Sequence, residues 1–180
     1  MDNFWKDAAP EKESNYIDAN SVQICTVTSV EYNEQYNRLN FVFTNDKEQT
    51  GKGSFSMSDS AMPFVRSFII SMAIKGGVEE SLKTAVPDGA LGTGQSLVDK
   101  VAPVLVGTKV AVLFGGKQSK GNWYAEAQLF GSLAEPTPEG VAVLEAKRLT
   151  KQNDPKFMKG EEVKGEEVKV ADTPVEEIKF

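Results

Sequence analysis

Two short stretches of this chain combine aromatic rings with basic side chains, and a further lysine stands between two glycines. The residues concerned are Tyr32, Tyr36 and Arg38, then Lys52, then Lys117, Lys120, Trp123 and Tyr124. Aromatic rings stack on the exposed faces of unpaired bases, at about 1–3 kcal/mol per base, without reading the base sequence. Lysine and arginine bind the phosphates and release counterions. Brought to one surface, these side chains would bind single-stranded nucleic acid.

The composition leaves little room for catalysis. The sequence contains no histidine and one cysteine, Cys25, which excludes disulfides, Cys/His metal sites and an imidazole base. Cys25 lies in a strand-like apolar segment, so we expect a packed core thiol. Three acids near strand ends, Asp46, Glu48 and Asp59, could bind Mg²⁺ through oxygen, and a metal-dependent nuclease is the remote alternative. We expect a non-enzymatic protein without a cofactor.

The elements that would position the aromatic and basic residues follow from the hydrophobic pattern. β-Branched and aromatic residues with period-two alternation indicate strands, and longer apolar segments between Pro and Gly indicate helices. The segment 115–121 between the last two strands is expected to be a flexible basic loop. The phenylalanines of the strands, Phe41, Phe43, Phe55 and Phe114, are expected in the core. The predicted strands are 21–32, 38–44, 50–57, 109–114 and 122–130, and the predicted helices are 61–74, 78–85 and 95–101.

Three strands, a helical stretch and two strands form the element order of the OB-fold, a five-stranded Greek-key barrel. We therefore predict a mainly β protein of this fold, with helices between strands three and four. Ligands of OB-folds lie across strands two and three and against the loops that join strands one to two and four to five. The aromatic and basic residues fall in these places. Another small α+β domain with the same elements is the alternative.

Charge and composition divide the chain into four parts. Residues 1–19 read as an irregular arm, 20–135 as the folded domain, 136–159 as a connector with room for a short helix, and 160–180 as a disordered acidic tail. The tail carries seven acids and three lysines, a charge of −4 out of the total of −6. Residues 1–159 carry 19 acids and 17 bases, so their charge is −2. A nearly neutral body can still carry a local basic stripe.

The N-terminus has no basic and apolar signal-peptide pattern, and the longest apolar run, 64–74, is too short to span a bilayer. We therefore expect a cytoplasmic protein with no membrane partner. An oligomer is compatible with the sequence. A small β-barrel that binds another protein, with no nucleic acid involved, is the first alternative function.

The last seven residues, 174–180, close an acidic run with apolar side chains. This ending resembles the tip of single-stranded DNA-binding proteins, where acidic residues precede Ile-Pro-Phe, with Lys179 here in the place of proline. The segments 63–70 and 105–110 are similar to those of bacteriophage members of that family. The resemblance implies sequence-independent binding and protection of single-stranded DNA in phage replication and recombination. It also implies that the tail recruits replication or recombination proteins, through Glu176, Glu177, Ile178 and Phe180.

Overall fold

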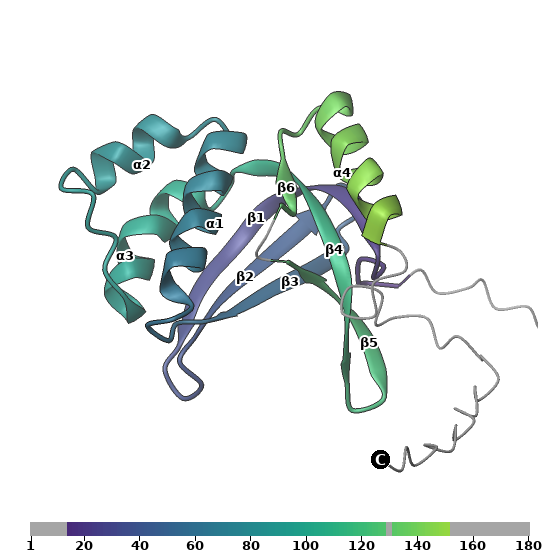
Figure 1. The fold of residues 1–180 in the computed structure, drawn as a ribbon, viewed down its shortest axis with the longest axis horizontal. Coiled ribbons are helices and arrows are strands. Elements are labelled where there is room, and N and C mark those ends of the chain that lie inside the picture. Colours follow the sequence, from purple (N-terminus) through teal and green to yellow (C-terminus); the bar gives the residue numbers. More distant parts are fainter. Residues whose placement is uncertain (1–13, 129–130, 152–180) are drawn as a thin grey trace, which may run out of the picture.

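The computed structural model describes residues 14–128 and 131–151, which form a ring of strands with helices packed around it (Figure 1). It is 35% helix and 34% strand, so the fold is mixed α/β, and the prediction of a mainly β protein is wrong. The large helical share comes from the three helices predicted between the strands and from a helix in the connector 136–159, where the sequence left room for a short one. The strands are β1 (Ser21–Asn33), β2 (Arg38–Asn45), β3 (Thr50–Ser56), β4 (Lys109–Ser119), β5 (Asn122–Ala127) and β6 (Leu133–Ala134), and the helices are α1 (Met62–Lys75), α2 (Glu79–Ala85), α3 (Gly94–Leu105) and α4 (Pro138–Lys151).

The strands close on themselves. β1, β2 and β3 form an antiparallel meander, and β3 then pairs with β5 in parallel. β5 is antiparallel to β4, and β4 is antiparallel to β1, which completes the ring β1-β2-β3-β5-β4-β1. The short β6 pairs with β4 outside this ring. The result is a barrel-like sheet in which all five main strands have two neighbours.

Alternation along the strands decides which side chains enter the barrel. In β2, Leu39, Phe41 and Phe43 are fully buried, while the residues between them face outward. β1 changes its alternation once, because its register with β2 shifts between Val27 and Ser29. This β-bulge adds one residue to β1, so the inward and outward alternation after it is shifted by one position. Residues on both sides of the bulge, Val27 and Val30 among them, are therefore buried.

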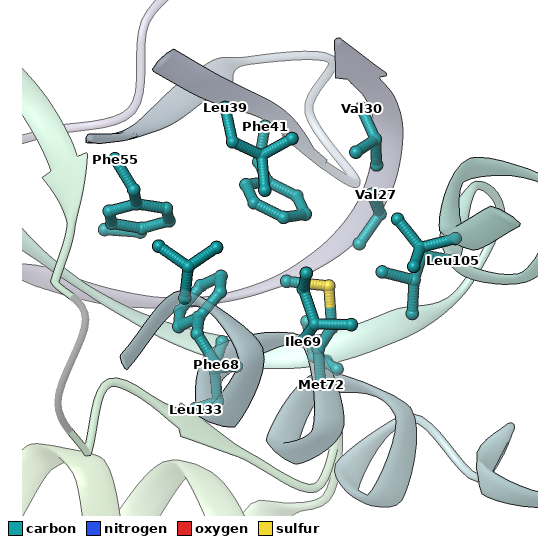
Figure 2. Close-up of a cluster of buried hydrophobic side chains, with 14 of the residues drawn as sticks. Val27, Val30, Leu39, Phe41, Phe55, Phe68, Ile69, Met72, Leu105 and Leu133 are labelled. Carbon is teal, nitrogen blue, oxygen red and sulfur yellow. The ribbon is translucent and has the colours of Figure 1, made fainter. Parts of the chain in front are cut away.

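The core forms where α1 and α3 pack against the inner side of the strands (Figure 2). Phe41 of β2 contacts Phe68 of α1 edge to face, with ring centroids 5.4 Å apart. The four phenylalanines predicted as core residues are all buried, and Cys25 is buried as well, so both predictions are confirmed. None of the helices within residues 14–128 and 131–151 is long and apolar enough to cross a bilayer.

The segment predicted as a flexible basic loop is mostly a strand. β4 continues to Ser119 and pairs with β5 from Phe114 to Ser119, so only Lys120 and Gly121, both with positive φ, form the turn. Gly115 and Gly116 are buried opposite β5. The prediction treated these glycines as loop residues, but pairing with β5 satisfies their backbone groups and holds them in the sheet.

Two further segments extend the barrel. α4 packs on the outer side of β1 and β4, where Leu144 is buried against Ala111 and Leu113. At the other end of the sequence, residues 14–17 lie along the start of β3. Ile17 N donates to Thr50 O at 2.9 Å, and Thr50 N donates to Asn15 O at 3.0 Å. Ile17 is buried, so this segment is fixed to the barrel.

Candidate nucleic-acid interface

Several outward-facing residues of β2, β3 and β5, with Lys117 of β4, form a largely polar surface, called the polar face below, which the apolar side chain of Val42 interrupts opposite Lys52. Their positions follow from the strand register, which places Asn40 opposite Ser54 and pairs Lys52 with Glu126. Inward-facing residues alternate with them and are buried. The polar face consists of Arg38, Asn40, Lys52, Ser54, Lys117, Tyr124 and Glu126.

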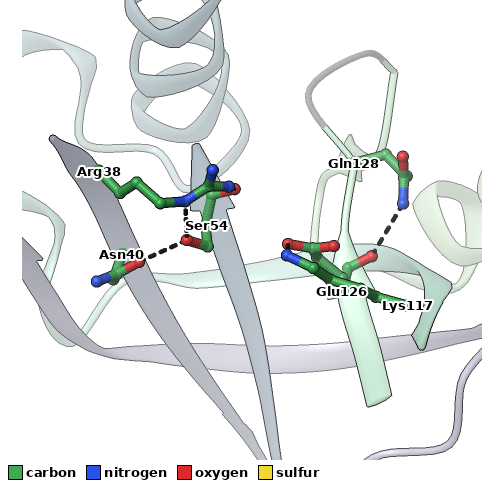
Figure 3. Close-up of polar contacts among 6 residues, drawn as sticks. All are labelled: Arg38, Asn40, Ser54, Lys117, Glu126 and Gln128. Carbon is green, nitrogen blue, oxygen red and sulfur yellow. Dashed lines mark hydrogen bonds and ion pairs between the residues drawn. The ribbon is translucent and has the colours of Figure 1, made fainter. Parts of the chain in front are cut away.

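Arg38 is held in one orientation on this face. Its Nε donates to Ser54 Oγ at 2.8 Å and its Nη2 donates to Ser54 O at 2.5 Å. Ser54 Oγ in turn donates to Asn40 Oδ1 at 2.7 Å, as Figure 3 shows. A guanidinium fixed in this way loses little conformational entropy when it binds an anion, and its planar donors suit phosphate oxygens.

Lys117 and Glu126 form an ion pair on the adjoining strands, with Nζ 3.1 Å from Oε1 (Figure 3). Lys52 is exposed on the other side of the β3–β5 seam. Among the described residues, no ion pair involves Lys52. Arg38, Lys117 and Glu126 line a pocket of about 350 Å³, to which Lys52 does not contribute. Among the described lining residues, the two cations Arg38 and Lys117 therefore outnumber the one acid, Glu126.

An aromatic pair borders the same seam. Tyr124 lies opposite Lys117 in the β4–β5 register and is exposed. Its ring meets that of Tyr16 edge to face, with centroids 6.5 Å apart and an interplanar angle of 88°. Tyr16 is exposed and stands beside Thr50 of β3. Sequence reasoning missed Tyr16, although its neighbour Ile17, an apolar residue in a polar arm, is a signal that the segment docks onto the barrel.

The structure therefore brings together four of the eight residues predicted to bind single-stranded DNA. These four are Arg38, Lys52, Lys117 and Tyr124. Tyr32 lies elsewhere: it packs against the core on the inner side, and its hydroxyl donates to Asn37 Oδ1 at 3.1 Å. Its position follows from the bulge in β1, which puts Tyr32 in phase with buried Val30.

The remaining predicted residues lie near the ends of strands. Tyr36 is exposed in the turn between β1 and β2, and Lys120 is exposed in the turn between β4 and β5. Trp123 pairs with Gln118 in the β4–β5 register. The partner-binding residues of the tail, Glu176, Glu177, Ile178 and Phe180, lie outside the described residues.

The acids considered for a metal site do not lie on the polar face. Asp46 and Glu48 stand in the turn between β2 and β3, and Asp59 precedes α1. In residues 14–128 and 131–151, no three His, Cys, Asp or Glu side chains gather closely enough to hold a metal ion.

Comparison with known proteins gives no identification. No protein-family model matches the chain, and no curated protein is detectably similar to it in sequence.

Proposed function

We propose that this protein binds single-stranded DNA across the polar face, without sequence preference and without catalysis. The observation that carries the proposal is the meeting of cationic, aromatic and hydrogen-bonding side chains on one outer surface of a closed ring of strands. Arg38, Lys52 and Lys117 would bind phosphates, while Tyr16 and Tyr124 would stack on bases. Stacking and phosphate contacts together give affinity that does not depend on sequence.

The ring order supports an OB-fold as the specific architecture. A three-stranded meander, a helical connection, and a parallel contact between the third and fifth strands are all present. An OB-fold binds its ligand across strands two and three. In this chain those strands are β2 and β3, which carry Arg38, Lys52 and Ser54 outward.

We further propose that the protein acts in phage DNA replication or recombination, with its acidic tail recruiting partner proteins. The support is the segment 174–180, in which Glu176 and Glu177 precede Ile178 and Phe180. Aromatic and aliphatic side chains at the end of an acidic segment suit an apolar pocket rimmed by basic residues.

The test is fluorescence anisotropy of labelled oligo-dT titrated with the full-length protein, against a duplex of the same length. We expect salt-sensitive binding to the single strand and much weaker binding to the duplex. Lys52→Ala should weaken binding to all single-stranded sequences alike and lower the salt dependence, by up to about 0.7 in the slope of log K against log salt. Lys83→Ala on α2 removes the same charge from a helix outside the polar face and should leave binding unchanged. Absence of binding to oligo-dT at low salt would refute the proposal.

A further inference from the structure

The pocket on the polar face has an unusual internal arrangement of charge. Among the described residues that line it, two cations, Arg38 and Lys117, face one acid, Glu126. That acid makes an ion pair with Lys117 at 3.1 Å. A site with this excess of positive charge favours an anion, and its one carboxylate already stands where an anion would bind.

We propose that the pocket holds one phosphate group of the bound strand, and that the Glu126 carboxylate takes the place of that phosphate while DNA is absent. The inference rests on the proposed function. A phosphate oxygen makes the same charge-assisted contact to a lysine ammonium as a carboxylate oxygen does. On binding, Lys117 exchanges the carboxylate for the phosphate, and the carboxylate turns to water.

The exchange requires little energy. The side chains of Lys117 and Glu126 are 49% and 20% exposed. Ion pairs that water and salt can reach contribute little to the stability of a fold, because both screen the charges. Arg38 needs no rearrangement, since Ser54 already fixes its guanidinium beside the pocket. Glu126 therefore lowers the affinity for DNA without preventing binding.

The same arrangement affects the salt dependence. The Lys117–Glu126 pair carries no net charge, so a phosphate that enters the pocket is only partly neutralised while the carboxylate remains nearby. With glutamine at position 126, Lys117 contributes its full charge. The number of phosphates neutralised by the protein then rises by up to one, and each adds about 0.7 to the slope for single strands.

The test compares full-length wild type, Glu126→Gln and Glu80→Gln by anisotropy with labelled oligo-dT over a series of salt concentrations. Glu80 is a matched control because it also contacts a lysine, Lys83 at 2.9 Å, and lies on α2, far from β5 (Figure 1). We expect Glu126→Gln to bind about 3- to 10-fold more tightly at low salt, with a slope steeper by up to about 0.7. Glu80→Gln should match wild type. Glu126→Ala, checked for folding by circular dichroism, should change affinity in the same direction.

Two failures are distinguishable. If wild type binds oligo-dT while both Glu126 variants behave as Glu80→Gln does, the phosphate-mimic role of Glu126 is refuted and the proposed function stands. If wild type itself does not bind, the proposed function fails, and the inference fails with it.

Discussion

At the residue scale, Tyr124 is the aromatic residue that belongs to the polar face itself. Its side chain is 41% exposed, and it stands next to Lys117 in register. We expect Tyr124→Leu to lower the affinity for oligo-dT by about 5- to 100-fold, because one base loses its stacking partner. Tyr124→Phe should bind as wild type does. The control is Phe64→Leu, which alters an aromatic residue of similar exposure, 45%, on α1. Equal binding by Tyr124→Leu and Phe64→Leu, measured by anisotropy, would count against stacking at this position.

Cys25 gives a second residue-scale prediction, on pH dependence. Burial raises the pKa of its thiol to about 12, and the negative charge of Asp46 adds to the rise. In the unfolded chain, a cysteine thiol has a pKa of about 8.5. Between these pH values the unfolded state loses a proton that the folded state keeps. The free energy of unfolding therefore falls as pH rises, by up to about 1.4 kcal/mol per pH unit from this group.

This contribution can be measured by urea denaturation of wild type and Cys25→Ala at about pH 8 and about pH 10.5. Over this range the thiol ionises in the unfolded chain and stays protonated in the folded protein. Lysines and tyrosines titrate in the same range, so the quantity of interest is the difference between the two proteins. We expect wild type to lose more stability than Cys25→Ala over this interval. Identical losses would show that the thiol does not contribute.

Individual residues also show where strand alternation in the sequence no longer predicts whether a side chain is buried. Alternation placed Phe41 and Phe43 in the core correctly, since period two holds without interruption along β2. Tyr32 differs because the bulge near Thr28 shifts the alternation of β1, and no residue type marks that shift. Tyr16 was missed because its position depends on a backbone contact with β3, which lies far away in the sequence.

At the element scale, α4 packs against the barrel through Leu144, with the partly buried side chain of Val141 in the same cluster. Leu144 is 1% exposed and lies against β4, whereas Leu149 on the same helix is 53% exposed. Leu144→Ala should reduce the free energy of unfolding by about 2–5 kcal/mol, because it removes buried methyl groups and leaves a cavity. Leu149→Ala should change it by less than about 0.5 kcal/mol. Urea denaturation provides both values, and similar losses in the two variants would contradict this docking of α4.

Elements with a local hydrophobic pattern were predicted well. Elements whose length depends on pairing with another strand were predicted less well. The first three strands and α1 follow from alternation and from apolar spacing, and the structure places them within one or two residues of the prediction. β4 runs beyond its predicted end because Gly115 and Gly116 pair with β5, a partner that composition does not reveal. β6 has two residues, Leu133 and Ala134, which is too few for any periodicity.

At the scale of the whole molecule, the order of elements predicted a five-stranded barrel, and the ring of strands agrees with a barrel-like fold, although the strand pairs that close it were not identified from the sequence. Closure depends on contacts between distant segments, β1 with β4 and β3 with β5. The net charge of −6 is similarly uninformative about binding, because alternation sorts the charged residues onto faces. Arg38, Lys52 and Lys117 meet on the polar face although the chain as a whole is acidic.

The ring has one weak seam, and the polar face lies across it. β3 and β5 are paired in register only at Lys52 and Glu126 within the described strands, whereas β2 and β3 are paired from Arg38 to Thr44. Local opening follows the route that breaks the fewest contacts. We therefore expect hydrogen exchange to be faster for amides at the β3–β5 seam than for those between β2 and β3.

Binding of single-stranded DNA should close this seam. A strand that contacts Lys52 on β3 and Tyr124 on β5 holds both edges, so opening would require its release. With oligo-dT at about 100 times its Kd, opening should cost about 2.7 kcal/mol more, and exchange at the seam should slow by up to about 100-fold. Hydrogen exchange with mass spectrometry, on full-length protein with oligo-dT or with a duplex of the same length, measures this directly. Protection spread evenly over the barrel, or concentrated on α1, would place the DNA elsewhere, because only a ligand bridging β3 and β5 can selectively oppose the separation of these two strands.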